Sequence, residues 1–241
     1  MQEETKTPAW DSAHEALKIF ALTPNYNSWI FSAFRDYLAG KTVLEVGCGI
    51  GNLSRYFAGV SARFLALDTS EAFLGHLKLD QPGVEVHHLD ISDEKSLALA
   101  SAGVEAVVSA NVLEHVKEDE KALANIRAIL KPGGRLLLFV PAMSAIYGTL
   151  DEAVSHCRRY DAPELRAKAE AAGFEVEKLY FSNFIGVFGW YLNGRVLKKR
   201  NFPILQPLLF DKLVPLIAAL ERVFPPPFGM NLIMVARKKE A

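Results

Sequence analysis

Short apolar runs alternate with helix-like segments through the middle of this 241-residue chain, and this alternation constrains the fold most. Each run holds five to seven residues, and the segments between them repeat apolar residues at helical spacing. The predicted strands are Thr42–Val46, Arg63–Leu67, Val84–His88, Val104–Ala110 and Arg135–Val140. Because strand–helix–strand units wind right-handed, this order predicts an α/β fold, a doubly wound parallel sheet with helices on both faces.

The regions that flank the alternating core divide the chain further, although its length suits a single domain. The N-terminal region is predicted to form two helices, and a last strand is expected from Asn231 to Arg237. We divide the chain into an N-terminal helical lid (1–40), a core (41–141), a loop, helix and strand (142–182), an apolar insertion (183–229) and the last strand (230–241).

Charge and cysteine content exclude several function classes. The 27 basic residues nearly balance 28 acidic ones, whereas a protein that grips a phosphate backbone is usually far more basic, so nucleic acid is not the expected partner. Cys48 and Cys157 lie far apart without metal-ligand spacing, so we predict no metal site and a reducing compartment. Neither a signal peptide nor a transmembrane run is visible, which predicts a cytoplasmic location.

A glycine-rich turn, Gly47-Cys-Gly-Ile-Gly51, follows the first predicted strand. In a doubly wound sheet this place is the crevice outside the carboxyl ends of the strands, where ligands bind. The spacing differs from the G-x-G-x-x-G of nicotinamide enzymes. Glu45 precedes the turn, and a negative charge there gives no advantage to a pyrophosphate loop.

Acidic residues end the next two predicted strands. Asp68 is placed to accept hydrogen bonds from a ribose diol, and Asp90 with Ile91 offers one polar and one apolar contact for an adenine. Each residue has a structural alternative. Asp68 could cap the following helix, Asp93 is as well placed as Asp90, and Glu45 could only support the turn.

Four motifs, in order and spacing, resemble those of class I S-adenosylmethionine-dependent methyltransferases, most strongly over residues 40–140. They are Val43-Leu-Glu-Val-Gly-Cys-Gly-Ile-Gly-Asn52, Leu67-Asp-Thr-Ser70, Val107-Val-Ser-Ala-Asn-Val-Leu-Glu-His115 and Leu130-Lys-Pro-Gly-Gly-Arg-Leu136. The resemblance implies a seven-stranded Rossmann-like sheet whose last strand is antiparallel, with S-adenosyl-L-methionine as the cofactor.

The same resemblance implies a place for each cofactor contact. It places Gly47, Cys48 and Gly49 at the methionine part, Asp68 at the ribose, Asp90 and Ile91 at the adenine, and Asn111 near the methionyl end. Glu45, Gly51 and Thr69 complete the predicted cofactor-binding set.

The predicted acceptor site lies in the loop that follows the fifth strand. In a methyl transfer a base is needed only when the acceptor must lose a proton, and His156 is the candidate. Arg158 and Arg159 could hold an anionic acceptor, and the predicted substrate contacts also include Tyr26, Tyr147 and Tyr160. Structural ion pairs with Asp151 or Glu152 are the alternative for the loop, and a structural role is favoured for His115.

The apolar insertion is rich in Phe, Leu, Ile and Trp and carries a basic cluster at Arg195 and Lys198-Lys-Arg200. It could wall a pocket for a lipid-like acceptor, form a homodimer contact, rest on an anionic membrane, or enclose a small core of its own.

These patterns together predict methyl transfer from S-adenosylmethionine to a small hydrophobic molecule. Oxygen is the first expected methylated atom, with carbon and nitrogen as alternatives. A non-catalytic S-adenosylmethionine-binding or regulatory protein on the same fold is the competing prediction.

Overall fold

Seven strands form one sheet in the order β3-β2-β1-β4-β5-β7-β6 in the computed structural model, which describes residues 9–200 and 204–239. The strands are β1 (Thr42–Val46), β2 (Arg63–Asp68), β3 (Glu85–His88), β4 (Ala106–Ala110), β5 (Arg135–Pro141), β6 (Phe174–Ser182) and β7 (Asn231–Lys238). Strand β7 runs antiparallel to both of its neighbours, and the pairings from β3 to β5 are parallel. The doubly wound sheet with an antiparallel last strand is therefore confirmed.

The helices follow the predicted alternation, with two local differences. The α-helices are α1 (Ala9–Ala21), α2 (Pro24–Leu38), α3 (Ser54–Ala58), α4 (Glu71–Asp80), α5 (Asp119–Ile129), α6 (Thr149–Ala153), α7 (Ala162–Ala171), α8 (Phe184–Tyr191) and α9 (Leu205–Val223). The segment after β3 forms a 3-10 helix, η1 (Glu94–Ala102), and the loop after β5 contains a 3-10 turn, η3 (Ser144–Ile146), as well as α6. Further short elements are the 3-10 turn η2 (Leu113–His115) and the π-helical turn η4 (Leu192–Val196).

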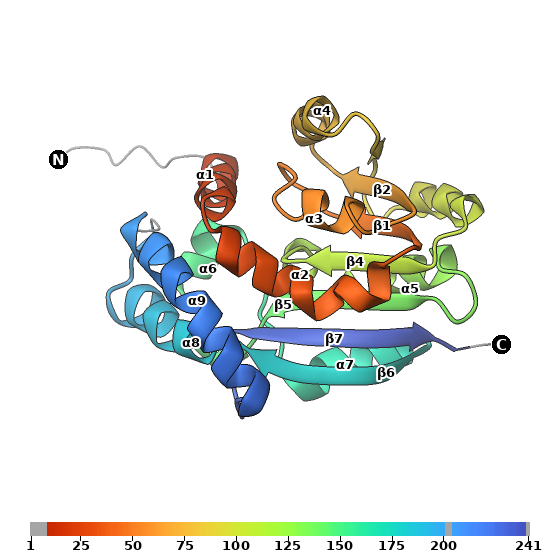
Figure 1. Ribbon diagram of the computed structural model, residues 1–241. Coiled ribbons are helices and arrows are strands. Elements are labelled where there is room, and N and C mark those ends of the chain that lie inside the picture. The colour runs from red at the N-terminus through yellow and green to blue at the C-terminus, as the bar shows by residue number, and fades with distance from the viewer. Residues whose placement is uncertain (1–8, 201–203, 240–241) are drawn as a thin grey trace.

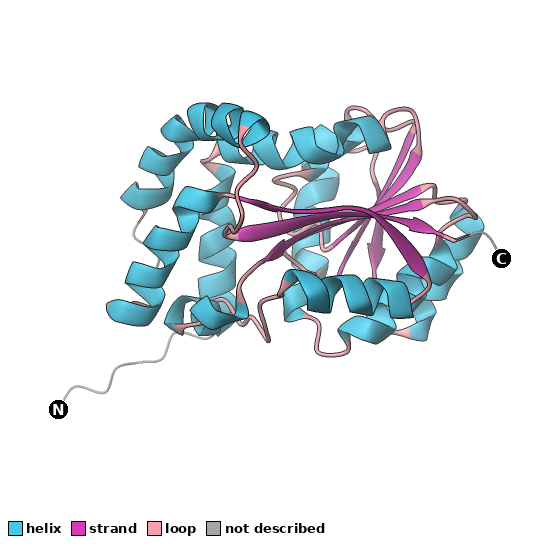
Figure 2. Cartoon of the chain, turned by 90° about the horizontal axis from the view of Figure 1, so that it is seen from below, coloured by secondary structure: helices cyan, strands magenta, loops and turns pink. Residues whose placement is uncertain are grey.

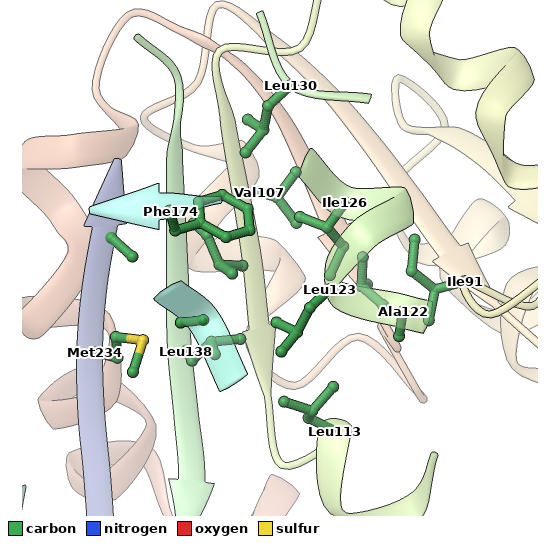
Figure 3. Packing of buried hydrophobic residues seen from close by; sticks show 14 of the residues in the cluster. Ile91, Val107, Leu113, Ala122, Leu123, Ile126, Leu130, Leu138, Phe174 and Met234 are labelled. Carbon is green, nitrogen blue, oxygen red and sulfur yellow. The ribbon is translucent and has the colours of Figure 1, made fainter. Parts of the chain in front are cut away.

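Helices cover both faces of the sheet (Figure 2). On one face, residues of α5 and α7 pack against β4, β5 and β7, and Leu123 and Ile126 of α5 lie in the same cluster as Phe174 of β6 (Figure 3). On the other face, α2, α3 and α4 cover the strands with side chains that include Phe34 and Phe57. Because both faces are covered, the central strands are nearly continuous apolar runs rather than alternating ones.

The carboxyl ends of the parallel strands face a group of helices that lies beyond the sheet, formed by α1, α6, α8 and α9 (Figure 1). Helices α8 and α9 belong to the segment between β6 and β7 and run antiparallel to each other. Asn193 donates to Gln206 at one end of the pair (3.0 Å), and Glu221 accepts from the Phe184 amide at the other (2.8 Å). A small core of Ile146, Val187 and Met230 lies beneath them.

Helix α9 is joined to the start of α2 by Asp211. Its carboxylate accepts hydrogen bonds from the backbone amides of Tyr26 (2.8 Å) and Asn25 (3.4 Å), which a helix leaves unpaired in its first turn. Pro215 cannot donate to the Asp211 carbonyl four residues before it, and the Asn25 side chain donates to that carbonyl instead (3.2 Å). A residue of α9 therefore caps α2 from a distance of 185 residues along the chain.

Among the helices of the described residues, none is both long enough and apolar enough to cross a membrane.

Candidate functional site

A cavity of about 860 Å³ lies at the carboxyl ends of β1, β2 and β4. Its floor comes from the strand ends and the glycine turn, and its walls come from α1, α2, the loop after β5, α8 and the start of β7. This is the topological position at which doubly wound sheets bind ligands. Its size is typical of a site for a ligand of several hundred daltons.

The glycine turn brings backbone to the cavity because its conformation excludes side chains. Gly47 has a φ of +73°, and a Cβ there would lie 2.3 Å from Cγ2 of Val112. The amides of Gly47 and Cys48 donate to the Leu67 carbonyl of β2, at 2.7 and 3.2 Å. Gly47, Cys48 and Gly49 all line the cavity, whereas Gly51 lies outside the lining and packs against Leu77 of α4.

Asp68 holds this turn in place. Its Oδ2 accepts from the Gly49 amide (2.8 Å), and its Oδ1 accepts from the Ser70 amide (2.9 Å). The helix-capping side chain is that of Ser70, which accepts from the Phe73 amide. Asp68 lines the cavity beside Thr69, and each of its oxygens keeps a lone pair for a ligand hydroxyl.

Glu45 is a buried carboxyl at the base of the cavity. Burial raises the pKa of Glu45 to about 7, although the hydroxyl of Ser54 donates to it. Burial likewise raises the pKa of the Cys48 thiol, so this cysteine is a neutral lining residue.

The predicted adenine contacts lie on the same side of the cavity as the glycine turn and Asp68. Asp90 accepts from the amide and the hydroxyl of Ser92, while Asp93 caps η1, so the two acids have different local roles. Ile91 is buried. It lines the cavity together with Asp90 and Asn111. Asn111 follows β4 with a φ of +55°, a conformation that asparagine tolerates better than most residues.

On the opposite side, the buried carboxylate of Asp151 gathers four donors. Nδ1 of His156 lies 2.9 Å and Nε of Arg159 2.7 Å from its Oδ1, while Nε1 of Trp190 (3.0 Å) and the Gly148 amide (2.9 Å) reach its Oδ2. Although burial raises the pKa of Asp151, the hydrogen bond from His156 and the charge of Arg159 bring it below its ordinary value. The ion pairs offered as the structural alternative for this loop are thus present at Asp151.

His156 and Arg159 also line the cavity, so their pairing with Asp151 does not remove them from the site. The Nη1 of Arg159 donates to the Ala142 carbonyl (2.8 Å), and its buried Nη2 has no hydrogen-bond partner among the described residues. Its guanidinium lies 4.7 Å from the ring centre of Trp190. An orphaned cationic donor at a cavity wall is suited to a ligand oxygen.

Glu114 lies beside Nε2 of His156, outside the cavity lining. Its side chain is fully buried, its Oε1 is 3.7 Å from Nε2 of His156, and neither oxygen makes a hydrogen bond within the described part of the chain. Burial raises the pKa of Glu114 to about 7. The neighbouring His115 packs edge-on against the His156 ring, and burial, together with His156, lowers the pKa of His115 to about 4.

These three side chains could also hold an ion. Glu114, His115 and His156 each offer one ligand atom, and the three atoms lie within 4.8 Å of one another. One carboxylate and two imidazoles form a donor set that suits a transition metal such as zinc. The absence of a metal therefore stays a prediction.

Three of the predicted acceptor contacts lie away from the cavity. Tyr160 is buried and donates to Asp119 (2.8 Å), Arg158 forms an ion pair with the same carboxylate (2.6 Å), and Tyr147 donates to the His156 carbonyl (2.8 Å). Successive side chains of an extended segment point to opposite sides, so Arg159 reaches the cavity and Arg158 does not. Their placement does not support a contact with the acceptor.

Tyr26 does line the cavity, and its hydroxyl lies 3.3 Å from Oδ1 of Asn231. Burial raises its pKa. Trp190, Met230 and Asn231 were not in the predicted site. No local pattern marks them, because the insertion and the last strand reach the cavity only once the sheet has formed.

Comparison with known proteins identifies relatives of this chain. Residues 44–138 match the family described as "Methyltransferase domain". A probable S-adenosylmethionine-dependent methyltransferase of Mycolicibacterium smegmatis is 34% identical over 161 residues, which cover 66% of this chain and 60% of that protein. A ubiquinone biosynthesis O-methyltransferase of Thiobacillus denitrificans is 31% identical over 185 residues, 70% of this chain and 79% of that protein.

Other relatives with the latter name match over a shorter part, and the chain spans about half of their length. Among solved structures, a 1,6-didemethyltoxoflavin-N1-methyltransferase of Burkholderia thailandensis, solved with bound 1,6-didemethyltoxoflavin and S-adenosylhomocysteine, superimposes with a TM-score of 0.61. It is 19% identical and the match covers 95% of this chain and 85% of that one, so it shows a shared fold.

Proposed function

Since the chain belongs to the class I S-adenosylmethionine-dependent methyltransferases, we propose that it methylates an oxygen atom of a small hydrophobic molecule. The observation that carries this proposal is that one cavity has two chemically different sides. The glycine turn and Asp68 form one side, and His156, paired with Asp151, forms the other.

The cofactor side fits S-adenosylmethionine by shape and by donor set. The carboxylate of Asp68 would accept the ribose hydroxyls, Ile91 would cover the adenine face, and the close backbone approach at Gly47 and Gly49 would receive the methionine part. Glu45 would lose its proton when the ammonium group of the methionine part lies beside it. The cofactor supplies a methyl group bound to a sulfonium sulfur, which is already a good leaving group.

His156 is the proposed base for an acceptor hydroxyl. Asp151 at Nδ1 fixes the imidazole orientation, and Asp151 together with Glu114, which lies 3.7 Å from Nε2, would stabilise the imidazolium once the ring has taken the proton. A bound cofactor, held by Asp68 and the glycine turn, would give its methyl group to the acceptor oxygen, and its sulfur would keep the electrons of the carbon–sulfur bond. Alignment of these atoms within about 3–3.5 Å is the main task of such a site.

The acceptor side favours a hydrophobic molecule with at least one oxygen. Phe20, Ile30 and Met230 contribute apolar wall, while Nη2 of Arg159 is an unused donor. The name of the relatives, ubiquinone biosynthesis O-methyltransferase, supports oxygen as the methylated atom and a lipid-like acceptor.

The test measures binding and transfer separately. Calorimetry with S-adenosylhomocysteine is performed on the wild type, Asp68→Ala and His156→Gln, and transfer of a labelled methyl group is followed with a panel of phenols that carry apolar tails. We expect Asp68→Ala to lose nucleoside binding. His156→Gln should bind normally but transfer about 10²–10⁴-fold more slowly.

Arg158→Gln is the matched control, because Arg158 lies beside His156 in the loop but pairs with Asp119. Normal nucleoside binding without transfer to any compound of the panel would contradict the enzymatic proposal. It would favour the non-catalytic cofactor-binding alternative.

A further inference from the structure

Exposed apolar side chains are concentrated in the insertion. Of the 18 large hydrophobic residues that are exposed in the described part of the chain, 14 lie between residues 183 and 229. They are Ile185, Phe188, Tyr191, Leu192, Val196, Leu197, Ile204, Leu205, Leu209, Leu213, Leu216, Leu220, Val223 and Phe224. Monomeric proteins seldom leave such a patch uncovered.

The exposed residues of α9 form a regular stripe. Leu205, Leu209, Leu213, Leu216 and Leu220 recur every three or four residues, and Leu209 and Leu216 are 62% and 61% exposed. The opposite face, with Val214 and Ile217, is the one buried in the molecule. Helix α9 therefore has a second apolar face that contributes nothing to the core.

Helix α8 separates the cavity from the same exposed region. Trp190 lines the cavity, whereas Phe188 and Tyr191 on either side of it along the helix are exposed. One helix thus has its inner side in the acceptor half of the cavity and its outer side in solvent.

Charge distinguishes the insertion from the rest of the chain. Residues 183–229 carry six basic and two acidic residues, a net charge of +4, whereas the remainder carries 21 basic and 26 acidic residues, a net charge of −5. Both acids of the insertion accept backbone hydrogen bonds, Asp211 from α2 and Glu221 from the start of α8. The basic residues are all exposed, and among the described residues only Arg200 has a carboxylate within ion-pair distance.

We propose that the outer face of the α8–α9 pair docks on a bilayer that contains anionic lipids. The leucine stripe would enter the interface between head groups and acyl chains, and the basic side chains would contact lipid phosphates. A second copy of the chain fits less well, because a two-fold contact would bring identical basic patches together.

Docking in this orientation would place the α8 wall of the cavity next to the lipid. A hydrophobic acceptor could then reach the site from the membrane, a consequence that rests on the proposed function. The docking itself does not depend on it.

Vesicle flotation of the full chain tests the proposal, with vesicles of neutral phosphatidylcholine and vesicles that contain roughly 30% phosphatidylglycerol. We expect binding at least tenfold stronger to the anionic vesicles, and weaker binding at about 0.5 M salt because surface charges are then screened. Each basic side chain at such a surface contributes roughly fivefold, so Lys198→Glu/Lys199→Glu should lower binding at least about tenfold. Lys95→Glu/Lys121→Glu, elsewhere on the surface, is its matched control.

A second pair of variants isolates the apolar contribution. Leu209→Glu/Leu213→Glu should abolish flotation, whereas Leu79→Glu/Leu97→Glu should not, although Leu79 is 81% exposed. Affinity for S-adenosylhomocysteine, measured on every preparation, shows that each variant is folded and separates failure of docking from failure of the proposed function.

Two results would overturn the proposal. One is a wild type that ignores anionic vesicles while it still binds the nucleoside. The other is a dimer in sedimentation equilibrium that dissociates in Leu209→Glu/Leu213→Glu and does not float, which would assign the face to a second copy.

Discussion

The two sides of the cavity are built in different ways. On the cofactor side, the predicted contacts follow the ends of β1, β2, β3 and β4, and each is placed by the strand before it. On the acceptor side, His156 and Arg159 of the loop after β5 and Trp190 of α8 meet at one carboxylate, that of Asp151. The first arrangement depends on local backbone geometry, and the second depends on a single buried group.

The carboxylates of the two sides, Asp68 and Asp151, also hold different kinds of hydrogen-bond donor. Asp68 holds backbone amides and stays at the edge of the cavity, so its loss leaves amides that a ligand or water can reach. Asp151 holds the guanidinium of Arg159, which is itself buried, so its loss would leave that cation without its paired carboxylate. We therefore expect the acceptor side to be the more fragile of the two.

The largest expected effect is that of Asp151→Ala. Removal of one partner from a buried ion pair costs about 3–5 kcal/mol, because the charge of Arg159 stays buried and uncompensated. Urea unfolding measures this change. Glu152→Ala is the control, since this neighbour is exposed and lies 3.5 Å from Arg200, which is exposed as well. A comparable loss of stability in both variants would contradict the special role of the buried Asp151 carboxylate.

Gly47→Ala tests the cofactor side. A left-handed alanine costs about 1–2 kcal/mol, and the overlap of its Cβ with Val112 adds about 1–3 kcal/mol. Affinity for S-adenosylhomocysteine should also fall, because the turn must shift. Gly40→Ala has nearly the same φ, +70°, with nothing within 4 Å of the new Cβ, so it should lose only the backbone contribution and bind normally. Equal losses in the two variants would show that packing at Gly47 is unimportant.

The pH dependence of stability should come mainly from the buried carboxyls. The pKa of Glu114 rises from 4.5 to about 7 on folding, so the folded protein keeps a proton that the unfolded chain releases. The contribution of Glu114 to the free energy of unfolding is fully present below pH 4.5. It is lost as the pH rises through 7, by about 3 kcal/mol in total.

Glu114→Gln should remove this decrease of the free energy of unfolding with pH, and should raise the free energy of unfolding above pH 7. Glu45→Gln should remove the corresponding decrease that comes from Glu45 on the cofactor side. Denaturant unfolding between pH 5 and 8 measures both variants, and a slope of unchanged size in Glu114→Gln would show that this carboxyl is ionised throughout.

The smallest effect should distinguish two adjacent arginines. Arg158 pairs with Asp119 at a partly exposed position, where Lys168 and Tyr160 also reach the carboxylate, so Arg158→Gln should cost at most about 1 kcal/mol. The KM for the acceptor should not change. Arg159→Gln should instead raise this KM, and a rise in Arg158→Gln as well would restore the predicted pair of arginine contacts.

The sequence predicts the cofactor side better because its determinants are local. The alternation of strands and helices places Gly47 and Asp68 at strand ends before any packing is known. On the acceptor side, the sequence marks the correct loop but not which of Arg158 and Arg159 faces the cavity. That choice depends on how the extended segment pairs with its neighbours, as in the bridge between Ala142 and Tyr160.

The insertion was the least predictable part. A proline inside a helix removes a hydrogen bond and usually kinks or breaks the helix, yet α9 runs through Pro215 from Leu205 to Val223. The helix tolerates this proline because Asn25 of another helix donates to the carbonyl that Pro215 leaves without its usual donor. A compensating donor so far away in the chain leaves no local pattern.

The cap that Asp211 places on α2 limits how this protein could be redesigned. An engineer who excised residues 183–229 to obtain a minimal catalytic unit would also strip the first turn of α2 of its acceptors. Tyr26, Asn27 and Ile30, which that helix contributes to the cavity, would then lose their anchor. The insertion is therefore not a detachable module, and a graft onto another scaffold would have to carry α2 with it.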